Sequence, residues 1–141
     1  MPIFGGLNVW ALPLAAFGSF VFGAIWYMVL SRPWRKALHM DATAPAASPP
    51  PTMLAATFLA QLVMAWLFAQ LLLGLGRGGL TVSAGSGLVS GVFLWAGFIL
   101  MPMITSHMYQ RASRTLTLID GAHWLGVMVL QGVVLGALAI R

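Results

Sequence analysis

Four long apolar runs constrain what this chain can fold into more than any other feature. Three of them contain no charged residue, and the fourth contains only Asp120. A helix needs about 20 mainly apolar residues to cross a bilayer, and each run is that long. We therefore predict an all-α integral membrane four-helix bundle, one domain over residues 1–141, with spans at 8–30, 53–73, 83–105 and 118–140.

The composition argues against a soluble globule. Only 6% of the 141 residues are charged and 60% are hydrophobic, whereas a soluble domain carries about 25% charged residues. The formal net charge of +5 resides mainly in short loops. It is therefore better explained as a membrane topology signal than as a nucleic-acid interface, and we expect lipids, not nucleic acid, around this protein.

Aromatic and basic residues gather where the first and third spans end. Such residues sit at membrane–water interfaces and hold a span at its depth. A linker over residues 39–52 follows the first of these segments and is rich in proline and alanine, so it cannot continue a helix. The predicted interfacial anchors are Trp26, Tyr27, Arg32, Trp34, Arg35, Lys36, Arg111 and Arg114.

The basic residues are shared unequally between the two sides that four spans create. The loops after the first and third spans hold five of them, and the opposite side holds two, Arg77 and Arg141. Cytoplasmic loops carry the excess of Lys and Arg. We therefore predict that both termini lie outside the cytoplasm.

Small residues recur at four-residue intervals in the spans. This spacing lets two helices approach closely. Every helix carries such a stripe, which is more than the inner faces of a bundle need, so we expect the stripe of the first span and Gly87 with Gly91 to stay free for a partner. Our leading hypothesis is therefore an accessory membrane protein that packs against copies of itself or against a larger complex. The predicted helix-packing residues are Ala11, Ala15, Ser19, Gly23, Gly87, Gly91, Gly132 and Gly136.

Four polar residues within the spans support an alternative. Asp120 and His123 lie one turn apart, and Gln61 and Gln131 lie inside two spans. An ionisable residue in a span is costly and often functional, so a small transporter or channel with a polar site at Asp120 and His123 is possible. In the structural alternative, Asp120 is a helix N-terminal carboxylate that the helix dipole favours, and the two amides hydrogen-bond between helices.

A third hypothesis is a cofactor-binding subunit. His107 and His123 lie near the same membrane face on consecutive spans and would be the ligands of a haem or related pigment. The chain has no cysteine, so a covalent haem attachment motif, disulfides and thiolate metal sites are excluded. No nucleophile–base arrangement with a known spacing is visible, and we do not expect an enzyme.

Several short motifs resemble those of a known family. They are Asn8-Val9-Trp10-Ala11, Gly23-Ala24-Ile25-Trp26-Tyr27, Trp95-Ala96-Gly97-Phe98 with Pro102, and Leu118-Ile119-Asp120-Gly121. With them the chain resembles domain-of-unknown-function family 1761, small bacterial membrane proteins with about four helices. The resemblance implies a multi-pass protein of the bacterial inner membrane. It implies no activity and no catalytic residues.

The two halves of the chain also look loosely alike. Each contains a small-residue helix that ends in aromatic residues, then a basic loop and a second helix. This order predicts a weak parallel two-helix repeat.

Overall fold

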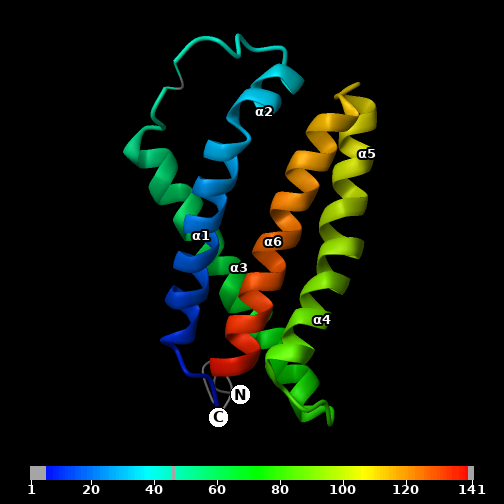
Figure 1. Ribbon diagram of the computed structural model, residues 1–141. Helices are drawn as coiled ribbons and strands as arrows, with labels where there is room; N and C mark the ends of the chain where they lie inside the picture. Colours follow the sequence, from blue (N-terminus) through cyan, green and yellow to red (C-terminus); the bar gives the residue numbers. More distant parts are fainter. Residues whose placement is uncertain (1–5, 46, 140–141) are drawn as a thin grey trace.

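A computed structural model describes residues 6–45 and 47–139. Within these residues every regular element is helical, which confirms the all-α class (Figure 1). Arg141, which entered the charge count above, and residue 140, the predicted end of the last span, lie outside the described residues. The elements are α1 (Ala11–Val29), α2 (Ser31–Ala37), α3 (Pro51–Arg77), α4 (Ala84–Leu94), η1 (Trp95–Leu100), α5 (Met101–Tyr109) and α6 (Arg114–Leu138).

Among the described residues, four helical segments are long and apolar enough to cross a membrane. They are α1, α3, the continuous run α4–η1–α5 over Ala84–Tyr109, and α6. Helix α3 extends beyond the predicted span 53–73. It continues through Gly74 and Gly76 and ends at Arg77. The turn begins at Gly78, and Gly79 then adopts a positive φ of 100°, a conformation that glycine allows.

The basic segment after the first span forms a short helix of its own, α2. It ends at Ala37, and His39 follows with a positive φ of 58°. A left-handed residue after the last turn is a common way for a helix to stop. Residues 38–50 then form the connection to α3, and Pro51 occupies the first turn of that helix, where its missing N–H costs nothing.

Helix α6 is the centre of the molecule. It packs against α4 and α1 most extensively, and against α3, α2, η1 and α5 to a lesser extent. Figure 1 shows α6 between α1 and the α4–α5 run, with α3 crossing behind α1. Helix α6 therefore contributes more buried residues than any other helix.

The contact of α4 with α6 is made by glycine. A Cβ at Gly87 would overlap the carbonyl oxygen of Gly132, and a Cβ at Gly136 would overlap that of Ser83. Gly91 lies equally close to the backbone of Met128. These backbones touch because no side chain separates them. The prediction that Gly87 and Gly91 stay available for a partner is wrong, because α6 of the same chain already covers them.

Helices α3 and α4 make no comparable contact with each other within the described part of the chain. In a two-helix repeat, α1 would correspond to α4 and α3 would correspond to α6. The counterpart of the contact between α1 and α6 would then be a contact between α4 and α3, and no contact of that extent is present among these residues. The first ten residues of α3 are largely exposed, and η1 and α5 bury no residue. The bundle is thus tightly packed at the end near the chain termini and splayed at the end that carries α2.

The third span changes its helical pitch before Pro102. Pro102 has no N–H to donate to the carbonyl of Phe98, and the six residues before Met101 form the π-helical segment η1. Such segments absorb a break in the hydrogen-bond ladder. Trp95, the first residue of η1, contacts α6, where its Nε1 donates to the carbonyl of Gly121 over 2.8 Å.

Candidate ligand-binding cavity

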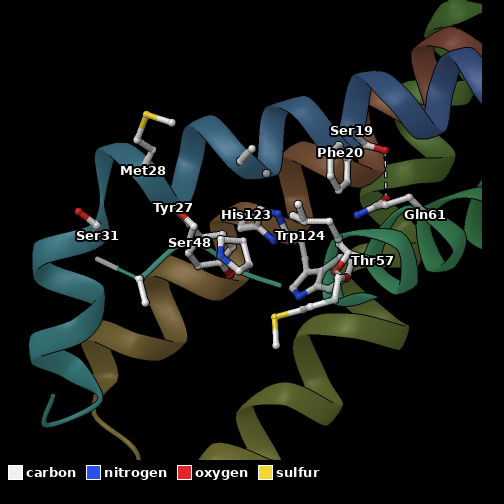
Figure 2. A pocket seen from close by; sticks show the side chains of 16 residues that line it. Ser19, Phe20, Tyr27, Met28, Ser31, Ser48, Thr57, Gln61, His123 and Trp124 are labelled. Carbon is white, nitrogen blue, oxygen red and sulfur yellow. Dashed lines mark hydrogen bonds between the residues drawn. The ribbon is translucent and has the colours of Figure 1, made fainter. Parts of the chain in front are cut away.

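A cavity of about 530 Å³ lies between α1, α3, α6 and the end of the linker. We call it the α1–α3–α6 cavity. Apolar walls come from Phe20 and Met28 of α1, Met53 and Leu54 of α3, and Trp124 of α6. Figure 2 shows Phe20, Met28 and Trp124 among the polar side chains that line the cavity. The cavity exists because α3 departs from α1 at its N-terminal half.

Polar side chains follow one line along this cavity. Ser19 and Tyr27 are eight residues apart on one face of α1, and Thr57 and Gln61 are four residues apart on one face of α3. Ser19 and Ser31 are twelve residues apart across α1 and α2, which corresponds to a rise of about 18 Å. The members of the line are Ser19, Tyr27 and Ser31 of α1 and α2, Ser48 of the linker, Thr57 and Gln61 of α3, and His123 of α6.

A buried polar cluster closes the inner end of the cavity. Ser19 Oγ lies 3.0 Å from Gln61 Oε1, and Gln131 Nε2 lies 3.0 Å from each of those two oxygens (Figure 2 draws the first contact). Gln131 also donates to the backbone carbonyl of Gln61 over 3.2 Å. Three helices are thereby joined by polar side chains that are almost completely buried. The predicted polar residues Gln61 and Gln131 therefore do meet.

The predicted pair Asp120 and His123 contacts α1 at Tyr27, which is closer to α2 than Ser19 is. Tyr27 donates its phenolic proton to Asp120 Oδ1 over 2.8 Å. The His123 ring packs against the Tyr27 ring at a centroid distance of 4.8 Å and stacks on Phe22 at 6.1 Å. Asp120 does not line the cavity, whereas Tyr27 and His123 do. The carboxylate contacts the cavity wall through its hydrogen bond to Tyr27.

Two tryptophans hold this part of α6 from opposite sides. Trp26 Nε1 donates to the carbonyl of Ile119 over 3.1 Å, and Trp95 Nε1 donates to that of Gly121. The two carbonyls flank Asp120. These bonds fix the depth and rotation of α6 where its ionisable residues face α1.

His123 is buried, with 6% of its surface exposed, and its Nδ1 has no hydrogen-bond partner. A Cβ on Gly23 would stand 2.8 Å from its Nε2, so the imidazole occupies the space that a larger residue would take. A buried polar nitrogen without a partner costs about 1–3 kcal/mol. Such an atom beside a cavity is a candidate contact for a water molecule or a ligand.

The small-residue stripe on α1 is also used within the chain. Ala11, Ala15 and Ser19 are buried with 1%, 0% and 0% exposure, and Gly23 faces His123. The prediction that this stripe remains free for a partner is therefore wrong. Close packing is needed here because α1 is held between α3 and α6.

The structure does not bring His107 and His123 together as ligands of one group. His107 Nδ1 lies 2.8 Å from Thr117 Oγ1, on the α5 side of α6, whereas His123 faces α1. Thr117 and His123 are six residues apart, which is about 9 Å of rise and a different helix face. Among the described residues no group of three or more metal-ligating side chains gathers.

The predicted anchors divide into two kinds. Arg32, Lys36, Arg111 and Arg114 are exposed at the α2 end of the bundle, as interfacial residues would be. Trp26 and Tyr27 instead bond to α6, and Trp34 packs edge-on against Tyr27 at 5.4 Å. Arg35 donates to the carbonyls of Asp41, Ala42 and Ala44 and so orders the first part of the linker.

Sequence reasoning missed several cavity residues. Ser31 and Tyr27 continue the four-residue spacing of the α1 stripe, so that stripe was the signal that could have found them. Ser48 and Thr57 come from the linker and the exposed start of α3. Their spacing in the sequence does not relate them to α1, because the tilt of α3 is what brings them to the same cavity.

These features define a multi-pass membrane protein whose spanning helices enclose a ligand-sized cavity. The chain belongs to the family described as Protein of unknown function (DUF1761), whose model matches residues 10–136. This confirms the resemblance seen in the sequence. No curated protein and no solved structure matches the chain.

Proposed function

We propose that this protein binds a lipid-phase small molecule in the α1–α3–α6 cavity and that it does so in the bacterial inner membrane. The observation that carries the proposal is the buried, unpartnered Nδ1 of His123 beside a cavity of about 530 Å³. Ligand pockets commonly measure about 300–1,000 Å³ and combine apolar walls with a few polar groups. The membrane location is inferred from the family and the four spans.

The cavity lies among membrane-spanning helices and has mainly apolar walls. A strongly hydrated ion would lose its water there with few groups to replace it. A molecule with an apolar body and a hydrogen-bonding group fits better, because its body contacts Phe20, Met28 and Trp124 and its polar group contacts His123 or Tyr27. We therefore propose a binding role and no catalytic one.

Trp124 provides the test. We expect 9,10-dibromostearyl alcohol, added to the protein in phosphatidylcholine nanodiscs, to quench tryptophan fluorescence saturably, because bromine quenches tryptophan on contact. Trp124→Phe should remove the saturable part. Quenching that never saturates, or that Trp124→Phe leaves unchanged, would overturn the proposal.

A matched pair of variants then locates the site. Ala24 lines the cavity, whereas Ala55 is exposed on α3 and does not line it. Ala24→Phe fills the cavity and should abolish the saturable quenching. Ala55→Phe adds the same bulk outside it and should leave quenching unchanged.

Transport remains the second candidate, supported by the one-ended shape of the polar line. The line starts at Ser31 and ends at the Ser19–Gln61–Gln131 cluster, beyond which Ala15, Ala65 and Leu72 are fully buried. Translocation would require these helices to separate. Liposome-reconstituted protein that moves the bound molecule across the bilayer would support transport, and binding without movement would exclude it.

The accessory role now needs a different argument from the one that the sequence supplied, since the small-residue stripes are covered within the chain. Self-association stays a prediction. Mass photometry of the purified protein in nanodiscs would test it directly.

A further inference from the structure

A second hollow lies beside the α1–α3–α6 cavity, between α2 and the first part of the linker. We call it the α2 hollow. Its volume is about 570 Å³, and it is lined by Arg32, Arg35 and residues 42–45. On α2 and on the linker, residues that line the cavity lie next to or close to residues that line the hollow. Ser31 lines the cavity and Arg32 the hollow, and residue 47 lines the cavity where residue 45 lines the hollow.

The α2 hollow carries excess positive charge. The guanidinium of Arg35 donates to backbone carbonyl oxygens, which carry no net charge, and its buried Nε has no partner. Arg32 and Lys36 are exposed beside it. Asp41 is the one acidic residue of this linker, and its carboxylate accepts from the amide and the hydroxyl of Thr43 over 2.8 and 2.6 Å. Three basic side chains of α2 therefore adjoin a linker that carries one carboxylate.

We propose that the cavity and the α2 hollow form one site for a single-chain amphiphile with a terminal oxyanion, a carboxylate or a phosphate. This inference rests on the proposed function. The chain lies in the cavity beside Trp124, and the oxyanion lies in the hollow at Arg32 and Arg35. Arginine suits this role because its planar fork pairs with either oxyanion.

The dimensions agree with one extended chain. The polar line from Ser19 to Ser31 is about 18 Å long, comparable to an extended long-chain fatty acid, and the hollow begins where that line ends. An anion at the level of His123 would be separated from the arginines. Its burial between apolar side chains would be unfavourable, because it would lose its hydration. An anion in the hollow remains near the end of the bundle, where the basic residues and the linker lie.

The test compares three probes with the same brominated chain in phosphatidylcholine nanodiscs. They are 9,10-dibromostearate, 9,10-dibromostearyl phosphate and 9,10-dibromostearyl alcohol, each followed by the quenching that depends on Trp124. We expect at least one anion to bind about tenfold more tightly than the alcohol, the gain typical of a charged hydrogen bond that is partly exposed. The tighter of the two anions identifies the head group.

Arg32→Gln and Arg111→Gln form the matched variants. Both arginines are exposed at the same end of the bundle, but only Arg32 lines the hollow. Arg32→Gln should reduce binding of the anion about tenfold and leave the alcohol unchanged, whereas Arg111→Gln should change neither. Because neither side chain is buried, both variants are expected to fold.

The outcomes separate this inference from the proposed function. If the alcohol binds but both anions bind no more tightly, the inference is wrong and the proposed function stands. Equal losses from Arg32→Gln and Arg111→Gln would show general surface attraction and would also overturn it. If no probe quenches Trp124 saturably, the proposed function itself fails.

Discussion

Tyr27 and Asp120 are joined by a hydrogen bond of 2.8 Å between α1 and α6. The bond links an aromatic residue near the end of the first span to the acidic residue of the last one. It gives the carboxylate a partner within the bundle, which an intramembrane acid requires. It also places the Tyr27 ring against His123, so this contact shapes one wall of the cavity.

Replacing Tyr27 with Phe should therefore destabilise the protein. The variant keeps the ring but leaves Asp120 Oδ1 without its donor, at a cost of about 1–3 kcal/mol. Unfolding in detergent by urea, followed by circular dichroism, measures the free energy of unfolding. In a double-mutant cycle with Asp120→Ala, which removes the acceptor, the two losses should fall short of additive. Strict additivity would mean that the two side chains do not interact.

The glycines between α4 and α6 predict a second effect on stability. Gly87→Ala should destabilise by about 1–3 kcal/mol, because its Cβ would overlap the backbone of Gly132. Gly97→Ala is the matched control, since a Cβ there meets nothing within 4 Å and alanine favours helix. The loss should appear in thermal unfolding without any change in oligomeric state. A Gly87→Ala variant as stable as wild type would contradict the observed packing.

The class of fold could be predicted because it depends on local properties. Apolar runs of sufficient length predict spans whatever their neighbours are, and four-residue spacing predicts close helix contacts. The partner of each stripe could not be predicted in this way. Gly87 meets Gly132 and Ala15 is covered within the bundle only because α6 is central, and that order depends on the sum of all helix contacts.

The site was predicted in pieces. Gln61, Gln131 and His123 were expected at a common polar site because polar residues in spans seek partners. Tyr27 was expected at the lipid interface, where aromatic residues are frequent, and its bond to Asp120 depends on the rotation of α1. The cavity itself depends on the tilt of α3, which no residue pattern in the sequence specifies.

The buried cluster of Ser19, Gln61 and Gln131 leads to a third prediction. Gln131→Leu removes the amide group that donates hydrogen bonds to Ser19 Oγ and to Gln61 Oε1. Hydrogen bonds between membrane helices contribute about 0.6–1.7 kcal/mol each, so we expect a loss of about 1–2 kcal/mol in the free energy of unfolding. Gln110→Leu, an exposed glutamine at the end of α5, is the control. A stabilised Gln131→Leu variant would indicate that the cluster serves function at the expense of stability.

Replacement of Arg32 and replacement of Arg35 should have different effects on ligand binding and on hydrogen exchange in the linker. Arg35 holds the linker through three backbone carbonyls, and the linker continues into the wall of the cavity at residues 47–49. Arg35→Gln should therefore loosen that wall and weaken the binding of both 9,10-dibromostearyl alcohol and 9,10-dibromostearate. Hydrogen exchange of a peptide covering residues 40–50 should accelerate in the same variant. Arg32→Gln is the control, because it removes a charge but no bond to the linker. It should neither accelerate exchange nor weaken alcohol binding. If Arg35→Gln weakens only the anion and leaves exchange unchanged, Arg35 acts through its charge alone and the linker does not depend on it.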